Sequence, residues 1–277
     1  MIARRFMRIL LQSCRVQLKL LSRHWPARLS DLLMPAAVAF VPVLLAGAVA
    51  GGEAGFYFSR RTNTANLAGF LLIGGGGFVL VTRALWGYGN WIRQEIRSGT
   101  LESLYLSPAA MPPILAGTAL AFMIYSALIF CGAMIVGALL FQTTFQTQQL
   151  PLAVVFLGLG LPAVYSLALL YGALVLQFKE TEALLQIAQW LITLLMGVYF
   201  PISLFPMALK IASLLFPPTW LTQGLRASLL GIPYLSASWA GDLAVLALFC
   251  LVGPVVAYFV YGRVERRLRQ QSGLGSF

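Results

Sequence analysis

Six long apolar runs constrain the fold of this chain more than any other feature. Each is close to the ~20 residues that an α-helix needs to cross a hydrocarbon layer about 30 Å thick. Only 10% of the residues are charged and 60% are hydrophobic, so the chain has too few polar side chains to coat a water-facing surface. We therefore predict an all-α membrane protein with six transmembrane helices. The predicted spans are residues 32–50, 67–91, 112–141, 151–178, 183–204 and 235–261.

The positions of the basic residues predict the orientation of the chain, because Lys and Arg accumulate in cytoplasmic loops next to membrane spans. With the N-terminus inside, the cytoplasmic flanks collect most of them: Arg4, Arg5, Arg8, Arg15, Lys19, Arg23, Arg28, Arg93, Arg97, Lys179, Arg263, Arg266, Arg267 and Arg269. The outer flanks hold only Arg60, Arg61, Lys210 and Arg226. We therefore expect both termini to be cytoplasmic, in a bacterial inner or plasma membrane. The net charge of +11 is then explained by basic residues that interact with anionic lipid. Nucleic-acid binding is not expected, because the sequence contains no recognisable nucleic-acid-binding module.

Residues 1–30 are predicted to form an amphipathic helix in the membrane interface, outside the transmembrane domain. At about 100° per residue, one sector of this helix is basic and polar: Arg4, Arg5, Arg8, Gln12, Arg15, Lys19 and Arg23. The opposite sector is apolar: Ile2, Phe6, Ile9, Leu10, Val16, Leu20 and Leu21. Such a helix lies flat at the membrane surface. Two roles are open, a membrane anchor or a surface against which a cytoplasmic partner rests.

Two features inside the second span are unusual. Gly74 to Gly77 are four consecutive glycines that remove the side chains from one stretch of helix. Small residues let helices approach closely and also loosen the backbone, so a packing site and a hinge are both open. Arg83 is a cation where charge is costly. Since no carboxylate lies within a helical turn of it, Arg83 either reaches the interface or pairs with a residue of another helix.

The sequence predicts neither a catalytic site nor a metal site. It contains no G-x-x-x-x-G-K-[ST] phosphate loop, so we do not expect this chain to bind ATP in the usual way. His24 is the only histidine, and Cys14, Cys131 and Cys250 lie far apart, which argues against a zinc site or a disulfide framework. All eight acidic residues lie outside the predicted spans or near their ends. Ion-coupled transporters usually keep an intramembrane carboxylate, so secondary transport is the weaker alternative.

A polar stretch follows the second span, from Trp91 to Pro108. It concentrates charges and hydroxyl groups on the predicted cytoplasmic side. Thr100 can cap a short helix there, and Glu102 lies near the positive end of that helix. Pro108 stops the helix before the third span. We therefore predict a short charged helix parallel to the membrane and accessible from the cytoplasm.

Two motifs give the sequence its resemblance to a known family. The first is Glu95-x-x-x-Gly99-Thr100-Leu101-Glu102-x-Leu104-x-x-Ser107-Pro108. The second runs through Gly197-Val-Tyr-Phe-Pro201, Phe205-Pro206, Pro217-Pro218-Thr219 and Gly224-Leu-Arg226. Both motifs, and the order of the predicted elements, resemble those of ABC-2 type transporter permeases, the transmembrane subunits of type V ABC exporters. The resemblance covers nearly the whole chain. The sequence departs from the family at Phe205-Pro206, where Leu-Pro is commoner.

The resemblance implies a role for each motif. The segment from about 94 to 107 would be a coupling helix that contacts the ATPase through Glu95, Gly99, Thr100, Leu101, Glu102 and Leu104. The loop 179–182 would be a second ATPase contact or only the cap of the next helix. The segment from about 205 to 231 would be a re-entrant helical pair before the last span. Its outer-gate residues would be Tyr199, Phe200, Pro201, Pro206, Pro218 and Arg226; an apolar lid without gating movement is the alternative.

The resemblance also implies an assembly and a function. A six-helix ABC-2 transmembrane domain would cover residues 31–265, with a cytoplasmic tail at 266–277. The chain would be a transport subunit and not an enzyme; it would bind no cofactor, and ATP and Mg²⁺ would be held by a separate ABC ATP-binding subunit. Two permease subunits, expected to be a homodimer surrounded by membrane lipid, would export an amphipathic, lipid-linked or polysaccharide substrate. An ion-coupled secondary transporter is the alternative.

Overall fold

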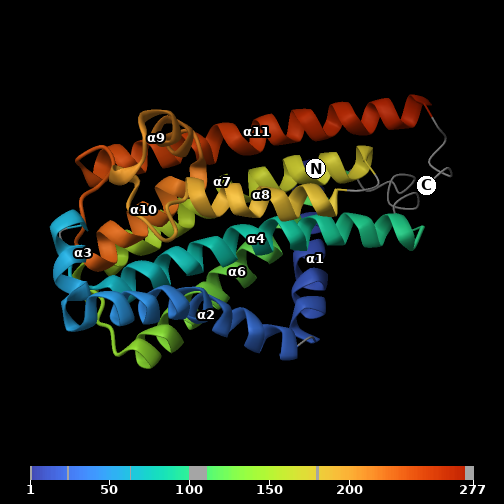
Figure 1. Ribbon diagram of the computed structural model, residues 1–277. Helices are drawn as coiled ribbons and strands as arrows, with labels where there is room; N and C mark the ends of the chain where they lie inside the picture. Colours follow the sequence, from blue (N-terminus) through green and yellow to red (C-terminus); the bar gives the residue numbers. More distant parts are fainter. Residues whose placement is uncertain (1, 24, 63, 100–110, 179–180, 272–277) are drawn as a thin grey trace.

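The computed structural model describes residues 2–23, 25–62, 64–99, 111–178 and 181–271. It is 88% helical and contains no strand in these ranges, which confirms the predicted all-α fold (Figure 1). The α-helices are α1 (Ile2–Arg23), α2 (Trp25–Ala50), α3 (Ala54–Thr62), α4 (Leu67–Arg97), α6 (Met111–Phe141), α7 (Leu150–Gln177), α8 (Glu182–Leu195), α9 (Met207–Leu214), α10 (Pro217–Leu230) and α11 (Trp239–Gln271). Three short 3-10 helices are η1 (Gly51–Glu53), η2 (Thr147–Gln149) and η3 (Ile202–Leu204).

The long helices run along one bundle with two distinct ends (Figure 1). One end is where α4 and α11 terminate, beyond the place where α1 lies across the bundle; we call it the basic end, because Arg93, Arg97 and Arg263 are near these helix ends. The opposite end, with α3 and α9, is called the distal end. Within the described ranges, five segments are long and apolar enough to cross a membrane: Leu29–Ala50, Leu67–Arg97, Pro112–Phe141, Thr147–Gln177 and Trp239–Arg267.

The predicted fifth span, 183–204, is shorter than expected. Helix α8 has 14 residues and ends at Leu195, so it is about 21 Å long. Gly197, at φ +59°, closes it with paired hydrogen bonds: the Gly197 amide donates to the Leu194 carbonyl at 2.9 Å and the Val198 amide to the Thr193 carbonyl at 3.2 Å. This is the Schellman arrangement, for which a left-handed glycine is the usual terminator. The chain then turns into η3, α9 and α10.

Helix α4 is the centre of the bundle and contacts α2, α6, α7 and α10. It begins at Asn66, whose side-chain oxygen accepts a hydrogen bond from the Gly69 amide at 2.8 Å, an N-cap that satisfies one otherwise unpaired backbone donor. The same side chain accepts from the Thr143 hydroxyl at 2.6 Å, which ties the start of α4 to the end of α6. From there α4 runs without interruption to the basic end, six residues further than the predicted 67–91.

The four glycines of α4 are packing positions on four sides of the helix. A Cβ atom at Gly74 would meet Arg226 and the Val198 carbonyl, and one at Gly75 would lie 2.9 Å from the Pro35 carbonyl of α2. At Gly76 it would meet Phe130 and Met134 of α6, and at Gly77 Thr222 of α10 and Met196. Successive residues point about 100° apart on a helix, so four in a row serve every neighbour. These contacts support the packing interpretation of the glycines over the hinge.

The N-terminal helix ends earlier than the predicted boundary at residue 30. Helix α1 stops at Arg23, and α2 begins at Trp25. The basic residues of α1 are exposed. Helix α1 packs against the start of α6, where a Cβ at Gly117 would lie 2.9 Å from Ser13. Apolar residues of α1 are exposed as well: Phe6, Val16 and Leu20 at 40%, 59% and 49%. A helix with a basic face and an uncovered apolar face fits a membrane interface, so that placement stays a prediction.

Candidate functional site

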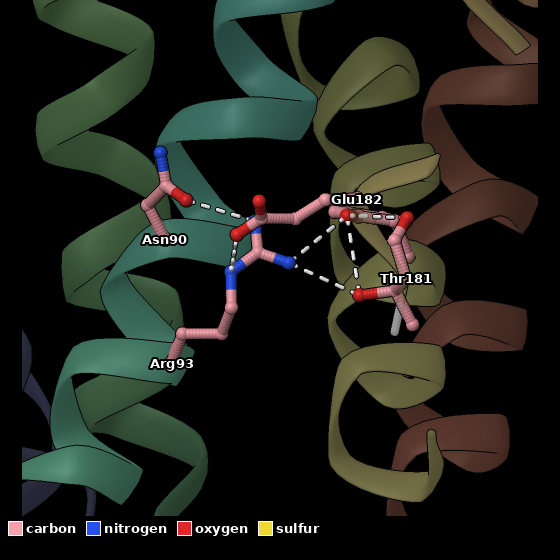
Figure 2. A network of polar contacts seen from close by, with 5 residues as sticks. Asn90, Arg93, Thr181 and Glu182 are labelled. Carbon is pink, nitrogen blue, oxygen red and sulfur yellow. Dashed lines mark hydrogen bonds and ion pairs between the residues drawn. The ribbon is translucent and has the colours of Figure 1, made fainter. Parts of the chain in front are cut away.

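Arg93 is the centre of a polar cluster at the basic end, between α4, α7 and α8 (Figure 2). Its guanidinium Nη1 donates to the Thr181 hydroxyl at 3.0 Å and to the Tyr171 hydroxyl at 3.3 Å. Nη2 donates to Asn90 Oδ1 at 2.8 Å, and Nε lies 3.4 Å from the Glu182 carboxylate. Only 9% of Arg93 is exposed, so these bonds lie in a low-dielectric region where they hold their geometry well.

The Arg93 cluster fixes the start of α8 against α4. Thr181 occupies the N-cap position of α8, but its hydroxyl accepts from Arg93 and makes no capping bond to the helix. Tyr171 of α7 donates to the Thr181 carbonyl at 3.3 Å, so a third helix holds the same residue. Of the loop 179–182, the described part is therefore a joint between helices; Lys179 and Glu180 lie outside the described residues. The structure leaves the ATPase contact of this loop as a prediction.

The coupling motif begins at Glu95, two residues after Arg93. Glu95 is in the last turn of α4 and half-buried, and Ser98 caps the helix. Gly99 adopts φ +67°, a left-handed conformation that glycine takes at little cost and that does not continue the α-helix. The remaining motif residues, Thr100, Leu101, Glu102 and Leu104, lie outside the described residues.

Thr181→Val and Glu182→Gln should separate the buried from the exposed part of the Arg93 cluster. We expect Thr181→Val to destabilise the protein by about 1–3 kcal/mol, because a buried donor loses its acceptor. Glu182→Gln should cost less than about 1 kcal/mol, because the Glu182 side chain is 57% exposed and its ion pair is screened. The melting temperatures of the purified variants in detergent test this order; a larger loss for Glu182→Gln would contradict it.

An apolar groove of about 740 Å³ lies at the distal end. Its walls are one side of α2, two aromatic residues of α3, the start of α4 and the turn that follows α8. That turn supplies Tyr199, Phe200, Pro201 and Leu204. Three of the predicted outer-gate residues thus meet at one surface. Pro206 and Pro218 are not in the groove wall: Pro206 precedes α9 and Pro218 is buried in the first turn of α10.

Arg226 of α10 is completely buried behind the groove wall. Its guanidinium donates to three backbone carbonyls: Phe70 of α4 at 3.2 Å, Gly197 at 2.9 Å and Val198 at 2.9 Å. The Phe70 ring lies under the guanidinium at 3.5 Å from Cζ to the ring centroid. Gly197 and Val198 follow the C-terminus of α8, where the helix dipole favours a cation. Counting Arg226 among the outer loop charges was therefore wrong; it joins α10, α4 and the end of α8.

Sequence reasoning missed two of these polar positions. Arg93 was predicted only as a flanking charge, although the spacing Asn90-x-x-Arg93 places both side chains on one helix face. Asp31 was not predicted as a partner of any residue, yet its carboxylate forms an ion pair with Arg83. This resolves the alternatives for Arg83: it pairs across helices.

The comparison with known families agrees with the architecture and with the motifs. A family model described as ABC-2 family transporter protein matches residues 67–272, from the start of α4 to just beyond the end of α11. Among curated proteins, none matches the sequence. The match covers well over half of the chain and includes the Arg93 cluster, the coupling motif and the distal turn. The chain therefore belongs to the ABC-2 family and is a multi-pass membrane subunit of a transporter.

Proposed function

We propose that this chain is the permease subunit of an ATP-driven exporter and that its ATPase is a separate polypeptide. In this proposal the basic end faces the cytoplasm of a bacterial cell, with both termini inside. The coupling motif Glu95 to Pro108 contacts the ATP-binding subunit, which holds ATP and Mg²⁺. The observation that carries the proposal is the Arg93 cluster, because it joins the helix that enters the motif to the helix that ends at the distal groove.

Helix α8 is tied to α4 at both of its ends. Arg93 holds its first residues, and Arg226 holds the carbonyls just after its last turn together with the Phe70 carbonyl of α4. Between these links only Leu185 and Ile192 of α8 are buried. A displacement of the basic end of α4 is therefore passed to the distal turn through two directed contacts. The helices α4 and α8 must then have two arrangements, and ATP must favour one of them by a few kcal/mol for transport to follow.

The outward face of α8 supports a dimer with the transport path between the subunits. Trp190 is 78% exposed and Ile187 63%, yet Gln186 is exposed on the same helix. An amide side chain is unfavourable against lipid, and such groups usually face protein or water. In a dimer, a second copy of the chain covers this face, and the transport path runs along α8 between the two subunits. We propose a homodimer, since one chain then supplies both halves by a twofold axis.

The distal groove supports an amphipathic, lipid-linked or polysaccharide substrate. Its wall is almost entirely aliphatic and aromatic, with Tyr57 and Tyr199 as polar-tipped rings. Aromatic faces bind both alkyl chains and sugar rings, so this wall suits each of the three classes.

The direct test is to purify the tagged chain from its native membrane and identify an ATP-binding subunit that copurifies. We expect Glu95 and Glu102 to face basic groups of the ATP-binding subunit. Glu95→Lys/Glu102→Lys should therefore reduce the copurified subunit and substrate-stimulated ATP hydrolysis at least about tenfold, because like charges across an interface cost several kcal/mol. Membrane insertion should persist.

Glu53→Lys is the matched control, a charge reversal at the distal end in η1. It should leave ATPase assembly at the wild-type level. Unchanged assembly and hydrolysis in the double variant would contradict the assignment of the coupling motif.

A further inference from the structure

A second cavity at the distal end lies beside the distal groove; we call it the distal pocket. It measures about 250 Å³ and is lined by the end of α3, the start of α4, residues 201–203, α9, α10 and the loop 232–235. Pro201 lines both the pocket and the groove. The end of α3 and the loop 232–235 lie outside the five apolar segments, so the pocket is at the membrane surface, where a dissolved ligand can reach it.

Two polar side chains of the pocket wall have donors that no other group uses. Lys210 of α9 is exposed, and within the described part of the chain its ammonium has no ion pair and no hydrogen bond. Ser203 of η3 is also exposed, and its hydroxyl likewise has no partner among the described residues. An ammonium carries three N–H donors and a hydroxyl one, so both side chains are available to a ligand.

The charge of the distal pocket is positive. Its lining residues, all of them described, include Lys210 and no carboxylate. Two buried charges lie behind the walls: Arg226 stacks on Phe70, and Asp242 accepts a hydrogen bond from the Leu235 amide at 3.0 Å. These two charges have opposite signs and offset each other at the pocket. The ammonium of Lys210 is therefore the charge that a ligand meets, and it favours an anion.

Hydrogen bonds outside the pocket hold its walls in place. Gln223 Nε2 of α10 donates to the Pro233 carbonyl at 3.0 Å, which ties α10 to the loop 232–235. Asp242 holds the same loop from α11. A site that is already formed loses less freedom when a ligand binds. Much of the remaining wall is apolar, as at Leu214, and a mostly apolar wall with a few polar groups is typical of sites for small organic molecules.

We infer that the distal pocket binds a small organic anion, a phosphate or carboxylate on a short carbon chain, through Lys210 and Ser203. The ammonium binds the oxyanion as a point charge, and hydrogen bonds to a charged group are stronger than those between neutral groups. The apolar part of the wall contacts the carbon chain. A ligand in the pocket also lies beside Pro201, and so beside the wall of the distal groove. The inference goes beyond the proposed function, because it requires neither an ATPase nor export.

The test measures binding of glycerol 3-phosphate to the full chain in phosphatidylcholine nanodiscs by isothermal titration calorimetry. Lys210→Met should weaken binding at least about tenfold, because it removes the charged donor. Lys210→Arg keeps the charge and should bind near the wild-type level. Ser203→Tyr keeps Lys210 but fills the pocket, so it should also weaken binding at least about tenfold. Arg60→Gln removes an exposed cation of α3 that does not line the pocket, and it should bind as the wild type does.

Two comparison ligands test the charge and the source of the anion. Glycerol lacks the phosphate and should bind at least about tenfold more weakly than glycerol 3-phosphate. Dodecyl phosphate carries the anion on an amphiphile: tighter binding that depends on Lys210 assigns the pocket to a lipid headgroup, and weaker binding assigns it to a dissolved ligand. Both results support the anion site. Unchanged affinity for glycerol 3-phosphate in Lys210→Met or in Ser203→Tyr, an equal loss in Arg60→Gln, or equal binding of glycerol would overturn the inference. Melting temperatures check that each variant folds, and Lys210→Met decides alone if Ser203→Tyr does not.

Discussion

Arg226→Met should lower the melting temperature of the purified protein by about 5 °C. The substitution preserves much of the side-chain volume but removes every donor from a fully buried position. The carbonyls of Phe70, Gly197 and Val198 then lose their partner, and a buried polar group left unpaired costs about 1–3 kcal/mol. A loss of about 3 kcal/mol corresponds to a shift of this size in a chain of this length.

The matched control for Arg226→Met is Lys210→Met. Lys210 is an exposed cation of α9 in the same distal segment. Its replacement should change the melting temperature by less than about 2 °C, because surface substitutions usually stay within about 0.5 kcal/mol. Equal shifts for the two variants would mean that Arg226 does not hold α8, α4 and α10 together.

Gly74→Ala should destabilise the protein by about 2 kcal/mol, although alanine is the better helix former. Intrinsic propensity alone favours alanine by about 1 kcal/mol in a helix interior. At Gly74, however, the added Cβ would contact the Arg226 guanidinium and would lie 2.6 Å from the Val198 carbonyl oxygen. Since that oxygen belongs to the backbone, α4 must move away from the end of α8, and overpacking of this kind costs about 1–3 kcal/mol.

Gly158→Ala isolates the propensity effect from the packing effect. Gly158 is in α7, and no atom lies within 4 Å of the position of its Cβ. It should therefore be neutral or slightly stabilising in the same melting experiment. Gly74→Ala should also cost less in an Arg226→Met background, because residues in contact are not additive. A Gly74→Ala variant as stable as Gly158→Ala would contradict the close approach of α4 to α8.

The sequence was enough to predict the long helices and their order. Apolar runs and turn residues are local properties of the sequence. A long apolar run in a lipid bilayer forms a helix, because a helix pairs all of its backbone polar groups internally. The shorter α8 was also visible in principle, since Gly197 and Pro201 together are a terminator signal. The prediction extended the span to residue 204 because Val198, Tyr199 and Phe200 are as apolar as the helix before them.

The pairing of charges could not be predicted from the sequence. Whether Arg83 meets Asp31 depends on how α2 and α4 are rotated and tilted against each other, which packing decides. Predicting orientation by counting charges also assumes that a cation between spans lies in a loop. This assumption is wrong for Arg226, which is buried in α10. Its partners are backbone carbonyls and not carboxylates. Backbone acceptors leave no signature in the sequence. The Arg93 cluster combines both cases, with a local partner in Asn90 and distant ones in Tyr171 and Thr181.

The central claim is that nucleotide-driven movement at the basic end reaches the distal groove through α4 and α8. The most direct measurement is the distance between spin labels at Val49→Cys and Leu204→Cys, which line the groove from α2 and from the turn after α8 and are 87% and 48% exposed. The labels are placed in a variant whose Cys14, Cys131 and Cys250 are replaced by alanine, assembled with the ATP-binding subunit that copurifies. We predict that ATP changes this distance distribution and that Arg93→Met abolishes the change while the ATPase remains bound. An identical distribution with and without ATP, or an ATP response that survives in Arg93→Met, would contradict the account.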